Sequence, residues 1–269
     1  MSDDVTIYKE PHSIPEYVKR AEKDEATKNI VSDNINALRR ISIRGGVFRL
    51  MQGDTELMST ESKKQYWVII NGSGIHRWYF KEDYQEGKFY APTCWSSNNK
   101  TPDEAVVEPM STSCMHCSYN VKGSGYGNSR ACRFHRKLAI VLYDDVAVKD
   151  GEAVAGDVYQ VVLPSTSIFG SGENYKWPLN KYVNFLDSHK VPVSTVVTEV
   201  KFDSSSAVPK LVFSPLKPLS EQEYEVVTER MKEDKVREAV KFSVTSSSKT
   251  GEDNNKNNVV KFKQLNNGE

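Results

Sequence analysis

The sequence predicts a mainly β protein, an antiparallel barrel or curled sheet with a few helices. Between about residues 39 and 243, apolar residues alternate with polar ones or form short runs, which is typical of strands. Two segments in that range show helical spacing instead. Strands and helices do not alternate along the chain, which disfavours a doubly wound fold.

The expected strands follow one another from residue 40. Residues 40–50 alternate in polarity and are interrupted by Gly45-Gly46, which favours a bulge or a sharp bend. Residues 65–70 and 75–80 flank the turn sequence Asn71-Gly-Ser-Gly74, and this spacing predicts a hairpin. Further strands are expected at 137–143, 157–163, 194–202 and 210–213.

Two helices are expected among these strands. Trp177-Pro178 opens the first, whose apolar face is formed by Leu179, Tyr182, Val183 and Leu186. Ser220 and Glu223 form a capping box that opens the second, which runs to about residue 240.

Composition excludes several classes of protein. The 269 residues suffice for one large or two small domains, with 38% hydrophobic and 10% aromatic residues to build a core. No apolar run is long enough to span a membrane, and the first residues lack a signal-peptide pattern. We therefore expect a protein of the reducing cytoplasm with no membrane partner.

All four cysteines of the chain lie close together in the sequence. Cys114 and Cys117 form a C-x2-C pair, with Cys94 before it and Cys132 after it. Four thiolates complete the tetrahedral shell of a structural Zn²⁺, and the surrounding residues 91–132 contain little that could form a core. A metal would supply the missing folding energy. An iron–sulfur cluster, scattered buried thiols or two disulfides are the alternatives.

Positive charge is concentrated beside the last cysteine, although the net charge of the chain is zero. Residues 121–138 contain basic and aromatic side chains without any acid. Such alternation suits single-stranded nucleic acid, because cations follow phosphates while rings stack on bases. A solvated basic loop is the simpler alternative. The candidate contacts in this stretch are Lys122, Arg130, Arg133, Phe134, Arg136 and Lys137.

Two tryptophans complete the candidate surface. Trp78 lies in a run of three aromatic residues that cannot all face one side of a strand, and Trp95 directly follows Cys94. Core packing is the alternative for both. The sequence offers no catalytic constellation, since its five histidines stand at no informative spacing from a nucleophile or carboxylate. We therefore expect a binding protein and no enzyme.

The cysteine-containing block resembles that of bacteriophage single-stranded DNA-binding proteins. The resemblance rests on residues 90–97, Cys114-Met-His-Cys117, Gly123-Ser-Gly125 and 130–134, and is supported by 177–182 and 209–215. It implies an OB (oligonucleotide/oligosaccharide-binding) barrel, a zinc site, and a coat for single-stranded DNA in phage replication or recombination. Some members of that family use a mixed Cys/His zinc shell and carry an acidic C-terminal tail. This chain has four cysteines for the shell, and its tail is not acidic.

The predicted organisation has three parts. Residues 1–38 form a polar arm with a short helix, 39–243 the OB-like domain with a metal-binding insertion at 90–137, and 244–269 a disordered tail. The resemblance places the protein in the cytoplasm of an infected bacterium, with replication or recombination proteins as partners through the tail. A zinc-containing transcription factor or an RNA polymerase accessory protein remains the alternative function.

Overall fold

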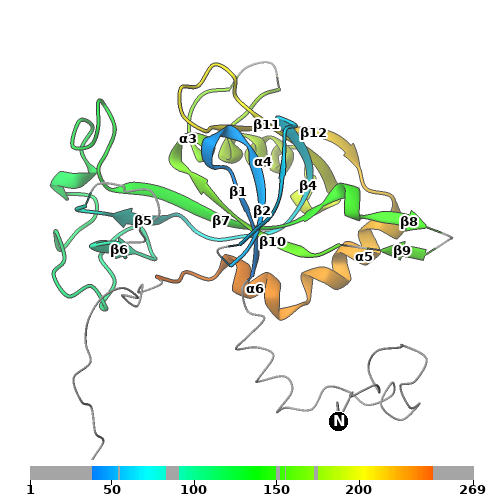
Figure 1. The fold of residues 1–269 in the computed structure, drawn as a ribbon, viewed down its shortest axis with the longest axis horizontal. Coiled ribbons are helices and arrows are strands. Elements are labelled where there is room, and N and C mark those ends of the chain that lie inside the picture. Colours follow the sequence, from blue (N-terminus) through cyan, green and yellow to red (C-terminus); the bar gives the residue numbers. More distant parts are fainter. Residues whose placement is uncertain are drawn as a thin grey trace, which may run out of the picture.

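The computed structural model describes residues 38–53, 55–82, 91–149, 152–154, 156–172 and 175–244. The predicted N-terminal helix and the predicted disordered tail lie outside these residues. The described residues form a mainly β fold with a few helices (Figure 1).

Eight strands form one continuous sheet in the order β12-β11-β4-β7-β10-β1-β2-β3. All neighbours in this order pair antiparallel except β1 and β10, which are parallel. The strands are β1 (Arg39–Ser42), β2 (Phe48–Gln52), β3 (Thr55–Thr60), β4 (Lys64–Gly72), β7 (Arg133–Leu142), β10 (Val158–Pro164), β11 (Val196–Phe202) and β12 (Leu211–Pro218).

The sheet is curled but open, so the expectation of an antiparallel barrel is only partly met. Within the described residues, β3 and β12 are edge strands and do not pair with each other. The curl brings Phe48 of β2 against Phe202 of β11, with ring centroids 4.5 Å apart. Strand β1 lies between β2 and β10, which is distant in sequence, and no local sequence pattern signals this parallel pair.

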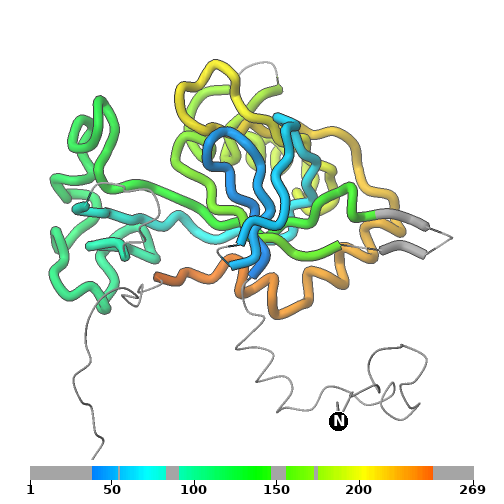
Figure 2. The backbone as a smooth tube through the Cα atoms, in the orientation of Figure 1, coloured from blue at the N-terminus to red at the C-terminus, as the bar shows by residue number. Residues whose placement is uncertain are grey.

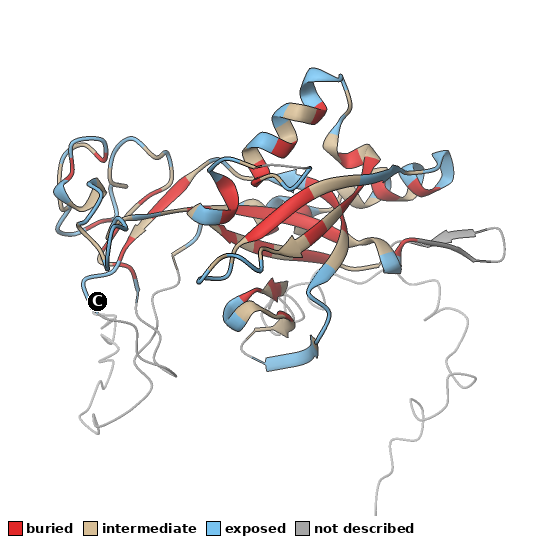
Figure 3. Ribbon diagram, turned by 90° about the horizontal axis from the view of Figure 1, so that it is seen from above, coloured by how far each residue is buried: buried red, intermediate tan, exposed pale blue. Residues whose placement is uncertain are grey.

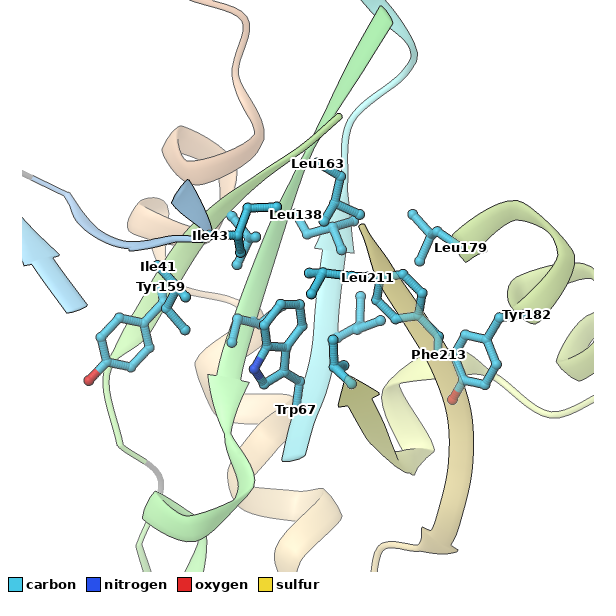
Figure 4. Close-up of a cluster of buried hydrophobic side chains, with 14 of the residues drawn as sticks. Ile41, Ile43, Trp67, Leu138, Tyr159, Leu163, Leu179, Tyr182, Leu211 and Phe213 are labelled. Carbon is cyan, nitrogen blue, oxygen red and sulfur yellow. The ribbon is translucent and has the colours of Figure 1, made fainter. Parts of the chain in front are cut away.

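Both faces of the sheet are covered. The larger core lies on the face that carries α3 (Ser165–Ile168) and α4 (Leu179–Ser188), and Trp67, Tyr182 and Phe213 are buried there (Figure 4). Full burial of a side chain such as that of Phe213 contributes roughly 1.5–3 kcal/mol. The second core lies under α5 (Glu221–Met231) and α6 (Asp234–Val240). Figure 3 shows the buried residues concentrated in the central strands.

The predicted helices are found, with one change. Pro178 precedes α4, and Leu179, Tyr182 and Leu186 are its buried face. The capping box of Ser220 and Glu223 opens α5 as expected. The single long helix expected there is instead two, because the chain leaves the helical conformation at Glu233 before α6 begins.

The predicted hairpin between residues 65–70 and 75–80 is wrong. The strands exist as β4 and β5 (His76–Tyr79), but both pair with β7, one after the other along its length. Ser73, in the link between them, bonds to Lys137 of β7 through its backbone N–H (2.8 Å) and its hydroxyl oxygen (2.9 Å). The Asn-Gly-Ser-Gly segment therefore connects two collinear strands and makes no reversal.

Gly45 and Gly46 form a turn between β1 and β2, so the expected bend is confirmed. Both have positive φ, +69° and +68°, the left-handed region that favours glycine. The bend converts the single alternating stretch 40–50 into an antiparallel pair. Strand β3 and the small hairpin of β8 (Ala147–Lys149) with β9 (Glu152–Val154) are additions that the sequence pattern did not indicate.

Candidate nucleic-acid interface and cysteine cavity

The N-terminal end of β7 extends beyond the eight-strand part of the sheet, which we call the main sheet, and pairs there with β5 in a branch of the same sheet. In it Arg77 lies opposite Phe134, and Trp78 lies opposite Arg133. Strand β5 pairs in turn with β6 (Cys94–Ser96). We call residues 76–79 and 91–132 the cysteine module. Figures 1 and 2 show it at one end of the molecule, joined to the main sheet through β7.

The four cysteines line a single cavity in this module. Its volume is about 20 Å³, room for roughly one water-sized sphere. Cys94 comes from β6, Cys114 and Cys117 from the C-x2-C pair, and Cys132 from the residue before β7. All four are free thiols, so the structure does not contain the alternative of two disulfides. The remaining lining residues are Tyr79, Pro102, Met110, Ser111 and Tyr119.

The four thiols are suitable donor atoms for a metal ion, but their orientation does not form a metal site. No carboxylate or imidazole of the described residues lines the cavity, and four sulfurs are the donors of a closed structural zinc site. As oriented, however, no three His, Cys, Asp or Glu side chains of the described residues form a group that could hold a metal ion. The lining therefore supplies the donor atoms of such a site, and binding of a metal would require the thiols to reorient around it.

Burial controls the protonation of two of these thiols. It raises the pKa of Cys94, and it raises the pKa of Cys132 to about 11 although the Arg77 guanidinium acts in the opposite direction. Both groups are therefore protonated at neutral pH. A dication that binds here displaces their protons.

The module has a small core and a buried arginine that ties it to β7. Tyr79, Cys94 and Val106 form this core, which is much smaller than the two cores of the main sheet. Arg77 is 4% exposed, and its side chain hydrogen-bonds to Asn99 and to the carbonyl of Cys114. Its guanidinium therefore connects the wall of the cysteine cavity to the strand that leads into the main sheet.

Phe134 gathers two arginines around its ring. The guanidinium carbon of Arg77 is 4.2 Å from the ring centroid, and that of Arg130 is 5.8 Å away. These are distances at which a cation is attracted to an aromatic ring. Arg130 is also fixed by a 2.7 Å hydrogen bond from its Nε to the carbonyl of Asn120. Phe134 therefore positions the exposed Arg130 at the surface.

A second ring and a third arginine continue this surface towards the helices. Phe169, which follows α3, packs edge-on against Phe134 with centroids 5.6 Å apart and remains 41% exposed. Arg136 shares the Phe134 side of β7 and donates a 2.9 Å hydrogen bond to Asn180 of α4. We call Arg130, Phe134, Arg136 and Phe169 the Phe134 surface.

The two predicted tryptophans lie on the other face of β5 and β6. Trp78 and Trp95 are opposite each other in the register, and Trp78 is opposite Arg133 of β7, which is exposed. Trp78 is stacked on His135, with ring centroids 3.4 Å apart. One face of its indole is therefore occupied by the protein itself.

Lys137 is inside the protein. It is 4% exposed, and its ammonium donates to the carbonyl of Lys241 at 2.7 Å and to the hydroxyl of Ser243 at 3.1 Å. It thereby fastens the chain that follows α6 and does not belong to the basic surface. Lys122, by contrast, is exposed in the loop of the cysteine module.

The structure assembles only part of the predicted contact set. Arg130 contacts the Phe134 ring, and Arg136 lies on the same side of β7 as Phe134. Arg133 lies on the face of the tryptophans, and Lys137 is buried. Phe169 was not predicted as a contact, although it stands in an aromatic-rich stretch that could have signalled it. Arg77 could be noted from the sequence only as a cation near aromatic residues, because its contact with Phe134 depends on the pairing of β5 with β7.

No family model, curated protein or solved structure matches this chain. None of the described helices is both long and apolar enough to cross a membrane. The assignment of function therefore rests on the residues of the chain itself.

Proposed function

We propose that the protein binds single-stranded DNA, without sequence preference, across the Phe134 surface. The observation that carries the proposal is the contact series Arg130–Phe134–Phe169, in which a fixed cation, a positioning ring and an exposed ring are adjacent. A single strand needs cations for its phosphates and ring faces for its bases. The resemblance to phage proteins adds the setting, a coat for single-stranded DNA in replication or recombination.

Each residue of the surface has a distinct role in this proposal. Arg130 and Arg136 contact phosphates, Phe169 stacks on a base, and Phe134 holds Arg130 in place. Arg133 and Lys122 add charge at the margins of the path. Trp78 and Trp95 support the module, because the Trp78 ring already stacks on His135.

The cysteine cavity has a structural role in the same proposal. Cys94, Cys114, Cys117 and Cys132 would hold one Zn²⁺, whose contribution is to fix the module that carries Arg130. Four thiolates leave no open coordination position, so the site supports no hydrolytic chemistry.

The test is a titration of fluorescein-labelled oligo-dT, followed by anisotropy, against the same length of duplex. We expect preference for the single strand and an affinity that falls with salt, with a slope of about −0.7 per phosphate contact. Arg130→Ala should reduce that slope by about 0.7. Phe169→Ala should weaken binding by about 5- to 150-fold, the equivalent of roughly 1–3 kcal/mol for one stacked base.

Arg237→Ala is the matched control, because Arg237 is exposed on α6, which packs against the other face of the sheet. It should bind like the parent. Equal affinity for duplex would favour the transcription-factor or polymerase-accessory alternative. Parent-like binding by both Arg130→Ala and Phe169→Ala, with melting unchanged, would show that the contact surface lies elsewhere.

A further inference from the structure

A loop of the cysteine module holds one aromatic side chain almost entirely in solvent. Tyr126 is 96% exposed, between Gly125 and Gly127. We call residues 121–131 the Tyr126 loop. A flexible loop could expose Tyr126 without any function. The exposure is informative only if the loop has a fixed conformation.

Hydrogen bonds fix the loop from within. The backbone N–H groups of Gly123 and Gly125 both donate to the carbonyl of Ser129, at 2.9 and 3.1 Å. The Ser129 hydroxyl donates to the carbonyl of Tyr126 at 2.7 Å. The Ser124 hydroxyl lies 2.7 Å from the carbonyl of Val121 and accepts from the N–H of Ala131 at 3.1 Å. These hydrogen bonds connect the residues that precede Tyr126 in the loop to those that follow it.

The glycines of the loop are required by this construction. A Cβ on Gly125 would lie 2.7 Å from Ser129 Oγ and 2.9 Å from the backbone N of Ala131, closer than atoms can approach. Gly123 and Gly127 have φ of +85° and +60°, which disfavour other residues. The loop is thus built for one conformation, and that conformation turns Tyr126 away from the protein.

The charges of the loop indicate which kind of partner would contact Tyr126. Lys122 and Arg130 are both exposed at its base, and residues 121–138 contain no acid. Arg130 is shared with the Phe134 surface through its contact with the Phe134 ring. Lys122 and Arg130 would attract a polyanion to this side of the loop, and the exposed ring of Tyr126 offers a face on which a flat group can stack.

We infer that Tyr126 is an additional base-stacking residue, which extends the single-stranded DNA path from the Phe134 surface onto the cysteine module. This inference rests on the proposed function. Because the backbone that carries the ring is already fixed before binding, stacking on Tyr126 requires little rearrangement of the protein, and stacking is indifferent to base identity.

Tyr126→Ala should weaken binding of oligo-dT by about 5- to 150-fold, with melting unchanged because the side chain has almost no contacts to lose. Tyr126→Phe should bind within about twofold of the parent, since the ring face remains. Val107→Ala is the control within the same module, at a side chain that is 95% exposed, and Tyr224→Ala on α5 is the control for loss of an exposed tyrosine. Both should bind like the parent.

A second measurement detects the contact directly. Irradiation of the parent bound to an oligonucleotide that carries 5-iodouracil should yield a cross-linked peptide containing Tyr126. If the parent binds oligo-dT and Tyr126→Ala binds equally well, the inference is wrong while the proposed function stands. If the parent fails to bind oligo-dT, both are wrong. Loss of binding in Tyr126→Phe as well as Tyr126→Ala would assign the effect to the hydroxyl and overturn stacking.

Discussion

At the scale of single residues, the position of a cation along β7 determines whether it is exposed or buried. Arg133 and Lys137 both belong to the acid-free basic stretch, yet the first is exposed and the second is 4% exposed. They share one face of the strand, but the helix α6 and the residues after it cover only the inner part. Exposure of a charge in a strand therefore depends on what packs over it.

Substitution of Lys137 should consequently affect stability, and substitution of Arg133 should affect binding. Lys137→Met removes hydrogen bonds from a charged donor to Lys241 and Ser243, and should lower the free energy of unfolding by about 1.5–3 kcal/mol with oligo-dT affinity unchanged. Arg133→Ala should leave urea denaturation unchanged and weaken binding at low salt. A stable Lys137→Met that binds poorly would return this lysine to the contact surface.

The buried histidine pair makes stability depend on pH. His76 and His135 are 6% and 3% exposed, with rings 5.6 Å apart and Phe242 packed against His76. Burial lowers the pKa of His76, and it lowers the pKa of His135 to about 3, with the His76 and Lys137 charges acting in the same direction. Around them, Lys137 and Arg136 lower the pKa of His76 further, whereas Asp103 raises it.

Because both folded-state pKa values lie below the unfolded value of about 6.5, the unfolded chain binds more protons below that pH. The contribution of these two histidines to stability is therefore fully present above about pH 6.5 and is lost as the pH falls, for His135 by up to about 1.4 kcal/mol per pH unit down to about pH 3. His135→Phe, which keeps a ring beside Trp78, should flatten the decline between pH 6.5 and 5 in urea denaturation. An unchanged slope would contradict this assignment.

At the scale of elements, strands were predicted better than their partners. The segments that became β4, β5, β10 and β11 are recognisable from apolar periodicity, and α4 from its spacing. The hairpin prediction is wrong because the turn signal is local, whereas β7, the strand that β5 pairs with, is distant in sequence. Strand β3 was missed because nearly all of its residues are exposed, which removes the alternation between a buried and a solvated face.

The candidate site shows the same division. The cysteine window and the basic stretch were visible as composition, and the structure places the four thiols around one cavity. Phe169 and Arg77 come against Phe134 only through packing of α3 on β7 and the pairing of β5 with β7. Such contacts depend on tertiary structure and leave no local pattern.

The cap of α5 offers a prediction about an element. Ser220 accepts from the N–H of Glu223, and the Glu223 carboxylate accepts from the N–H of Ser220 and from the hydroxyl of Tyr143. Ser220→Ala should lower the free energy of unfolding by about 1 kcal/mol. Tyr143→Phe, the comparison, removes one neutral-donor bond to the same carboxylate and leaves the cap bonded. An effect of Ser220→Ala below that of Tyr143→Phe would show that the cap contributes little.

At the scale of the whole molecule, the main sheet and the cysteine module have separate cores. The main sheet is stabilised by apolar packing on both faces, whereas the module has only a small cluster around Tyr79, Cys94 and Val106. A metal should therefore matter to the module and leave the sheet intact.

Elemental analysis of the gently purified protein should find about one zinc per chain, and a visible absorption band would indicate an iron–sulfur cluster instead. Chelation, or Cys117→Ser, should remove hydrogen-exchange protection from residues 94–96 and 114–132 while β4 and β10 stay protected. Well under one metal per chain, with full protection of the module, would contradict the metal assignment.

The order of strands in the sheet also has consequences during synthesis. Strand β4 lies between β7 and β11, so Trp67 faces Leu142 on one side and Thr198 on the other. At ribosomal speed, on the order of ten seconds separates the emergence of β4 from that of its second neighbour. Throughout that interval one edge of the apolar strand β4 is unpaired and can pair with other nascent chains. Fragments that end before β11 should therefore aggregate, and the full chain should fold slowly for its size, because the pairs β1–β10, β4–β7 and β4–β11 close long loops.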